Sequence, residues 1–214
     1  VAFGRCLIGW LSCVDLFARN PSRTQEICME KIKTIKRGQT LISAGELGTV
    51  WRVTQGVFRL ERQSMDGLSL VQLGLPGDLL GVESLCAEPY AYTVTAITAG
   101  EAKLQAVNGD LSRFGVVAKA YLQQQRRTCD MMKLRGGPVK DRLAHFLMLL
   151  ARNEDGTQRE LDRSDLPVLK DIAAILDITT ETVCRELKAF LPVREHKKQV
   201  HEAWETEQHL ALAA

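Results

Sequence analysis

Hydrophobic and polar positions follow two different periods along the chain, one typical of strands in its first half and one typical of helices in its second. From Gly38 to about Val107, short runs rich in β-branched residues are separated by turns that contain glycine. Many short strands at such even spacing predict a β-sandwich or a small barrel. The predicted strands are Thr40–Ile42, Val50–Val53, Val57–Leu60, Leu68–Val71 and Thr93–Ile97.

Helical segments are predicted on both sides of these strands. Ser22 and Gln25 resemble a capping box that opens a short helix through about Ile32. Residues 112–135 contain no proline and a single glycine, which predicts one helix of about 20 residues, ~30 Å long. A further helix is predicted over residues 139–151, and a charged loop follows it.

The long predicted helix carries the spacing of a two-helix seam. The seam positions recur at alternating steps of four and three, as they do in a coiled coil. They are Ala118, Leu122, Gln125, Cys129 and Met132. We therefore expect this helix to pair with its copy in a homodimer. The alternative is that the helix packs against its own barrel.

The segment from Leu166 to Leu187 predicts two short helices joined by a tight turn. The first helix would bury Ile172, Ala173 and Leu176, and the small alanine would let a second helix cross closely. The turn is expected at residues 177–179, because aspartate tolerates a left-handed backbone better than most residues. Thr179 or Thr180 can cap the second helix. The inward residues of that helix would be Val183, Leu187 and Phe190.

The outward face of the second helix suits the reading of bases in a major groove. Arginine can donate two hydrogen bonds to guanine O6 and N7, and glutamate can accept from cytosine N4. Glu181 and Arg185 lie four residues apart, so they are either base readers or a solvated salt bridge worth roughly 0.3–0.5 kcal/mol. The candidate DNA-binding residues are Thr179, Thr180, Glu181, Thr182, Cys184, Arg185 and Lys188.

Composition changes this picture little. The chain has 214 residues, 45% hydrophobic and 25% charged, which leaves room for one large or two modest domains of an ordinary soluble protein. A net charge of +2 argues neither for nor against nucleic acid. No apolar run approaches the ~20 residues of a membrane span. The apolar stretch over residues 6–16 ends without a signal-peptide cleavage site, so we expect a cytoplasmic protein with no membrane partner.

Reactive and metal-binding residue types form no recognisable site. The six cysteines lack a CxxC pair, so neither a disulfide framework nor a zinc site is indicated, and we expect most of them to be small buried residues. No histidine precedes His145, which disfavours haem and a cupin-type metal enzyme. A phosphate-binding glycine loop, a nucleophile elbow and a catalytic carboxylate pair are all missing. We therefore predict no metal site, and a protein that is not an enzyme.

Several short motifs, taken in order, resemble the CRP/FNR superfamily of bacterial transcription regulators over roughly residues 30–190. They are Gly38-Gln39-Thr40-Leu41, the Gly56 hairpin, Pro76-Gly77-Asp78-Leu79-Leu80-Gly81, Asp141-Arg142-Leu143-Ala144 with Phe146, and Glu181-Thr182-Val183-Cys184-Arg185. The resemblance implies an α+β protein. Its parts would be a sensor domain (1–110) with a cyclic-nucleotide-binding-type β jelly roll, a dimerisation helix (111–137) and a C-terminal winged helix-turn-helix DNA-binding domain (138–214).

The function that the resemblance implies is sequence-specific transcription regulation. The partners would be double-stranded DNA with a palindromic TGA-type site, a second copy of the chain and RNA polymerase. Glu181 and Arg185 would read bases, while Thr179 and Thr182 would contact phosphates. Thr180 stands where the cAMP-responsive branch has an additional arginine, so the recognition helix is more similar to the FNR type. Beyond Phe190 the usual glycine-containing wing is absent, and the tail is expected to form either a small hairpin with a basic tip or a solvated helix.

We expect either that the effector is not cAMP or that the sensor pocket is vestigial. Cyclic-nucleotide-binding members hold the ligand phosphate with an arginine and a glutamate after the Gly-Asp-x-x-Gly turn, but no lysine or arginine lies between Arg62 and Lys103. Burying a phosphate or a dicarboxylate without a cation is costly, so 2-oxoglutarate is disfavoured too. Arg126 or Arg127 could still supply the charge. The candidate pocket residues are Gly81, Val82, Glu83, Ser84, Tyr90, Tyr92 and Arg126.

The FNR branch also offers an iron-sulfur cluster on four cysteines, which this chain matches poorly. Cys6 and Cys13 are spaced one residue further apart than the family's last pair, and Leu104 occupies about the position where the barrel ligand is expected. Cys28 or Cys86 could substitute for the missing ligands. Such a cluster needs four good ligands, so we predict no cofactor. Cys129 on the seam is the redox candidate, with a buried, inert thiol as the alternative. The competing hypothesis is a small-molecule- or redox-sensing module whose DNA-binding domain is degenerate.

Overall fold

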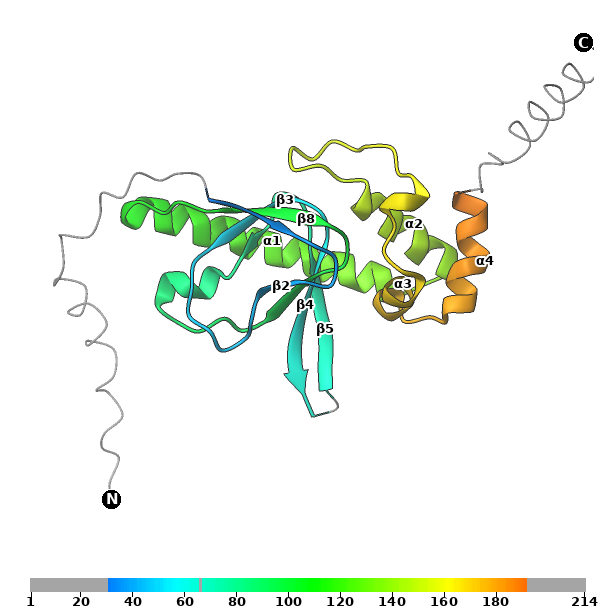
Figure 1. Cartoon of the computed structure of the whole chain (residues 1–214), viewed down its shortest axis with the longest axis horizontal. Helices are drawn as coiled ribbons and strands as arrows, with labels where there is room; N and C mark the ends of the chain where they lie inside the picture. Colours follow the sequence, from blue (N-terminus) through cyan, green and yellow to red (C-terminus); the bar gives the residue numbers. More distant parts are fainter. Residues whose placement is uncertain (1–30, 66, 192–214) are drawn as a thin grey trace, which may run out of the picture. The chain divides into compact units, whose positions relative to one another are not determined.

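Two four-stranded antiparallel sheets face each other in a β-sandwich of the jelly-roll type (Figure 1). The computed structural model describes residues 31–65 and 67–191. One sheet has the order β1 (Ile32–Ile35), β8 (Gly100–Leu104), β3 (Trp51–Gln55), β6 (Leu79–Leu80). The other has the order β2 (Thr40–Ile42), β7 (Thr93–Ala96), β4 (Phe58–Ser64), β5 (Gly67–Gly74). Buried residues between the sheets include Ile35, Val53, Phe58, Leu80 and Val94.

All five predicted strands are present, and the longest two extend well past their predicted ends. Strands β4 and β5 pair from Phe58 opposite Gly74 to Ser64 opposite Gly67, and the far end of this hairpin is exposed (Figure 1). Strands β1, β6 and β8 were not predicted. The strand-rich region, predicted to extend to about Val107, ends with β8 at Leu104. Of the helix expected at residues 22–32, Ile32 opens β1, Lys31 belongs to no helix or strand, and residues 22–30 lie outside the described residues.

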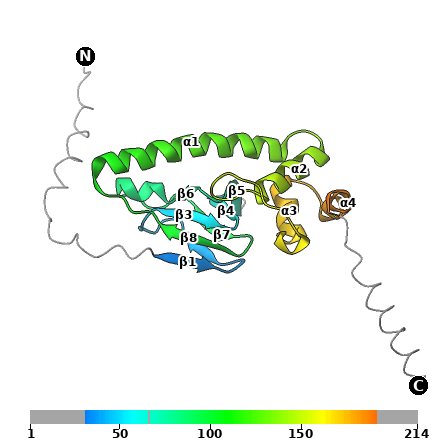
Figure 2. The ribbon, with the colours of Figure 1, turned by 90° about the horizontal axis from the view of Figure 1, so that it is seen from above.

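Helix α1 (Gly109–Arg135) begins three residues before its predicted start and lies along the sandwich (Figure 2). One of its faces is buried against the sheets. Gln123 accepts a hydrogen bond from the Leu79 N–H at 2.7 Å and donates one to the Leu79 carbonyl at 3.0 Å. This face of α1 therefore packs against its own sandwich, which is the alternative to pairing with a second copy of the helix. The opposite face contains the predicted seam, whose residues are exposed except for the half-buried Ala118.

The remaining helices form a second core that includes one end of the sandwich. They are α2 (Val139–Leu150), α3 (Leu169–Leu176) and α4 (Thr180–Phe190), and a short 3₁₀ helix, η3 (Arg163–Asp165), precedes α3. Their buried leucines and isoleucines cluster with Val57, Leu73, Leu75 and Ile97 of the sandwich. Because this core spans the predicted domain boundaries, the division into three domains stays a prediction. No helix among the described residues is long and apolar enough to span a membrane.

Candidate nucleic-acid interface and ligand cradle

Helices α3 and α4 are joined by the tight turn that the sequence predicts. Asp177 takes a left-handed conformation with φ of 53°, and the Ile178 N–H donates to the Ala173 carbonyl at 3.1 Å. Thr179 is the N-cap of α4, where its hydroxyl accepts from the Thr182 N–H at 3.3 Å. The buried residues of the pair are Ile172, Ala173, Ile175, Leu176, Val183 and Leu187, and Phe190 is half-buried against them.

Helix α4 presents a polar, exposed face. Of the seven candidate DNA-binding residues, Thr182 alone is half-buried, and its hydroxyl lies 2.9 Å from that of Thr179. Glu181 has no ion pair with any described residue, and Arg185 instead approaches the adjacent Glu186, Nε to Oε1, at 3.4 Å. The Arg185 side chain is 70% exposed. The salt bridge that was the alternative role for Glu181 and Arg185 is therefore not formed, and both side chains are open to a ligand.

Two arginines fix the position of the helix pair. Arg142, from the Asp-Arg-Leu motif of α2, donates to the Gly137 carbonyl at 2.9 Å and to the Leu176 carbonyl at 3.0 Å. It thereby ties the last turn of α3 to the segment between α1 and α2. Arg163 of η3 donates from Nε to the Leu191 carbonyl at 2.9 Å, just past the end of α4. The C-terminal ends of both helices are thus held by charged donors on backbone oxygens, which form stronger hydrogen bonds than neutral donors do.

The expected effector cradle, which we define as the space beside Gly48 and Gly81, is filled by the Tyr90 side chain. The Tyr90 hydroxyl accepts from the Thr49 N–H at 2.5 Å and donates to the Thr49 carbonyl at 2.7 Å. Its ring lies so close to Gly48 and Gly81 that a Cβ atom at either glycine would collide with it. Burial raises the pKa of Tyr90, although the hydrogen bonds with Thr49 oppose this effect.

The other candidate pocket residues are only partly brought together. Val82, Glu83 and Ser84 lie half-buried in the 3₁₀ helix η2 (Val82–Cys86), which follows Gly81, and the Ser84 hydroxyl donates to the Gly81 carbonyl at 2.7 Å. Tyr92 packs, partly buried, against the sandwich core. Arg126 is exposed on α1 and lines a separate cavity.

Among the described residues, Arg127 rather than Arg126 is buried, and its charge is neutralised by acidic side chains of the protein. Its guanidinium donates to both carboxylate oxygens of Asp78, at 2.7 and 2.9 Å, and to Asp130 at 2.6 Å. Burial alone would lower the pKa of Arg127, but the hydrogen bonds to Asp78 and Asp130 raise it above the usual value. Sequence reasoning missed this pairing, although Gln123 and Arg127 show helical spacing opposite the Asp78 turn.

The described cysteines contradict the expectation that most would be buried. Cys86, Cys129 and Cys184 are free and exposed, because each lies on the outer side of a helix. Cys6, Cys13 and Cys28 fall outside the described residues. In residues 31–65 and 67–191, no group of three or more histidine, cysteine, aspartate or glutamate side chains could hold a metal ion.

Comparisons with known proteins agree with this geometry. Residues 32–104 match the family described as "Cyclic nucleotide-binding domain". A CRP-family transcriptional regulator from Thermus thermophilus is 26% identical with a TM-score of 0.55, over 73% of this chain and 83% of that one. FixK2 from Bradyrhizobium japonicum is 22% identical with a TM-score of 0.56, over 75% and 83% of the two chains, and its similarity concerns the fold. No curated protein matches the chain.

Proposed function

We propose that this chain, in which a cyclic nucleotide-binding domain at residues 32–104 is built into a CRP/FNR-type fold, is a sequence-specific DNA-binding transcription regulator. The observation that carries the proposal is the α3–α4 pair. Its second helix is capped by Thr179, held at its C-terminal end by Arg163, buried on one side and polar on the other. A rigid helix with an exposed polar face is what a major groove accepts. The wing beside it falls in residues that are not described.

Glu181 and Arg185 are the proposed base readers. Both are exposed and lie one helical turn apart, and neither is engaged by the other. Arg185 would donate to guanine and Glu181 would accept from cytosine, as in a TGA-type half-site. Thr179 and Thr182 lie at the N-terminus of α4, where a backbone phosphate meets favourable N–H groups and fixes the register.

A homodimer is proposed from the exposed face of α1. Large apolar side chains form an exposed stripe along this face. A contiguous exposed apolar patch usually indicates an interaction site, because a monomer would normally bury such side chains. Their exposed fractions are 87% for Leu111, 72% for Phe114, 63% for Tyr121, 55% for Leu122 and 70% for Met132. A second copy of α1 is the partner that this stripe fits. Cys129 would then face its symmetry mate and remains the redox candidate.

We propose that the sandwich does not take cAMP. The segment between Arg62 and Lys103 supplies no cation, and Arg127 is committed to Asp78 and Asp130. The Tyr90 ring fills the space beside Gly81, and its hydroxyl satisfies the backbone of Thr49. A phosphate entering here would lose its hydration without gaining a charged partner, which costs several kcal/mol.

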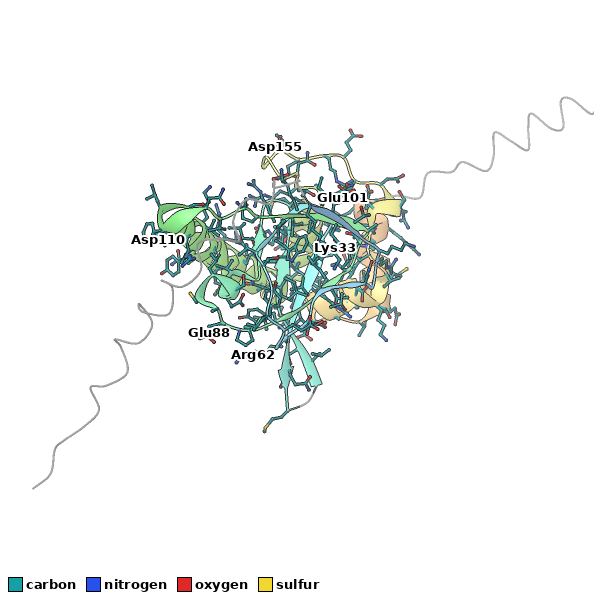
Figure 3. All side chains as sticks on the ribbon, turned by 60° about the vertical axis from the view of Figure 1, so that its left-hand side comes forward. Lys33, Arg62, Glu88, Glu101, Asp110 and Asp155 are labelled. Atoms are coloured by element: carbon teal, nitrogen blue, oxygen red, sulfur yellow. The ribbon has the colours of Figure 1, made fainter. Side chains whose placement is uncertain are left out.

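Selection from a random pool of DNA duplexes tests the proposal on the full chain. We expect a palindrome with half-sites about one helical turn apart. Arg185→Ala should relax the selection at one base pair of each half-site. Arg62→Ala should not, because Arg62, labelled in Figure 3, is an exposed arginine of β4 and not of the helix pair. If every duplex bound equally and binding disappeared with salt, the proposal would be overturned in favour of a sensing module with a degenerate DNA-binding domain.

A further inference from the structure

A cavity of about 310 Å³ lies outside the sandwich, where β3 and β6, helix α1 and the loop after α2 meet. Its lining includes Arg52, Gln105, Lys119, Arg126, Arg152 and Glu154. We infer that this cavity binds a small phosphate-bearing anion. Its volume falls at the lower end of the range for small-molecule sites, which suits a phosphorylated metabolite better than a nucleic-acid strand.

The charges around this cavity do not cancel. Four cationic and two acidic residues line it. Asp78 is already neutralised by Arg127, and Arg52 pairs with Glu154, Nε to Oε1, at 2.8 Å. The remaining cations are Lys119, Arg126 and Arg152. None of the three has an acidic partner among the described residues, so their mutual repulsion favours an anion between them.

Arg152 supplies a second, independent sign of a missing ligand. This residue is half-buried directly after α2, and its Nε atom is buried without any hydrogen-bond partner among the described residues. A buried donor without an acceptor costs free energy, most of all on a charged group. The Arg52 Nε atom is near Glu154 but is not aligned for a hydrogen bond. Guanidinium groups suit phosphate because two parallel N–H donors match two of its oxygens.

The location of the cavity connects it to the proposed DNA-binding helices. Arg152 and Glu154 belong to the loop that leads from α2 towards α3, and the labelled Asp155 marks this loop in Figure 3. Lys119 and Arg126 belong to α1, and Arg52 belongs to β3. A bound phosphate would therefore join the sandwich, the proposed dimer helix and this loop. The anion site thus lies outside the sandwich rather than in the cradle that Tyr90 fills.

Isothermal titration of the full chain with inorganic pyrophosphate, at physiological ionic strength and without DNA, tests this inference. We expect one site per chain. The variant Lys119→Gln/Arg126→Gln should bind about ten-fold or more weakly, as expected for losing at least ~1.4 kcal/mol of attraction. Lys133→Gln is the matched control, because Lys133 is an exposed lysine two heptads further along the same helix that does not line the cavity.

Three outcomes would overturn the inference. The first is equal affinity in the parent chain and in the double variant. The second is binding that disappears between low and physiological salt, which would indicate only diffuse attraction to surface cations. The third, measured in a separate competition experiment with added DNA, is displacement of pyrophosphate by duplexes of any sequence, which would make the cavity part of a DNA-contacting surface. Because the titration contains no DNA, its result is separate from the outcome of the duplex selection.

Discussion

Asp78 and Arg127 form a buried ion pair between the sandwich and α1, with Nε to Oδ2 at 2.7 Å and a second guanidinium nitrogen to Oδ1 at 2.9 Å. The Leu75 N–H donates to the same carboxylate at 2.8 Å. Arg127 also reaches Asp130, whose other carboxylate oxygen lies 3.1 Å from His145 Nε2 on α2. A continuous network of polar side chains therefore runs from the turn before β6, through α1, to α2, the helix that also contains Arg142.

Asp78→Asn should lower the free energy of unfolding by roughly 3–5 kcal/mol, because it leaves the Arg127 charge buried with a weaker partner. Asp78→Asn combined with Arg127→Met should lose less than the sum of the two single variants, since neither buried charge then remains. Urea unfolding followed by circular dichroism measures both quantities. Additive losses in the double-mutant cycle would show that the two residues are not energetically coupled.

The Tyr90 hydroxyl gives a stability change at alkaline pH. Burial raises its pKa in the folded state, so the folded chain keeps this proton at a pH where the unfolded chain loses it. The resulting stability is fully present below the unfolded pKa of about 10 and is lost as pH rises through the folded value. Unfolding measured at pH 8 to 11 should show this decline.

Tyr90→Phe should remove the part of the alkaline decline that comes from this hydroxyl. It should also cost about 1–2 kcal/mol at neutral pH, because the Thr49 N–H and carbonyl lose their partner. Tyr92→Phe is the control, since Tyr92 packs partly buried against the same core without a hydrogen bond to a described residue. An unchanged alkaline slope in Tyr90→Phe would contradict the assignment.

Features that depend on neighbouring residues could be predicted from the sequence, whereas features that depend on distant contacts could not. The turn at Asp177 and the cap at Thr179 depend on residues within one or two turns, so the pattern alone located them. Strand β6 is two residues long and depends on pairing with β3, far away in sequence, so no periodicity could reveal it. Arg126 and Arg127 differ by about 100° around α1. Which of them is buried depends on the Asp78 turn rather than on the helix.

Leu122→Glu should shift a dimer towards monomers, because it places a charge in the exposed stripe that we assign to the dimer contact. Sedimentation at several protein concentrations measures the effect. Leu68→Glu is the matched control, since Leu68 on β5 is 57% exposed and Leu122 is 55% exposed. Equal sedimentation of both variants and the parent chain would exclude this face of α1 as the dimer contact.

Arg185 and Lys188 should contribute differently to DNA binding although both are exposed cations on α4. Arg185→Ala should cost about 1–3 kcal/mol on the preferred duplex and relax selection at one base pair of each half-site, because a lost bidentate contact removes discrimination. Lys188→Ala should weaken all duplexes similarly and lower the slope of affinity against salt concentration, because a phosphate contact carries no sequence information. Fluorescence anisotropy on matched and single-mismatch duplexes over a salt series separates the two effects. If Lys188→Ala changed the base preference and Arg185→Ala changed only the salt slope, the assigned roles would be reversed and α4 would enter the groove in another orientation.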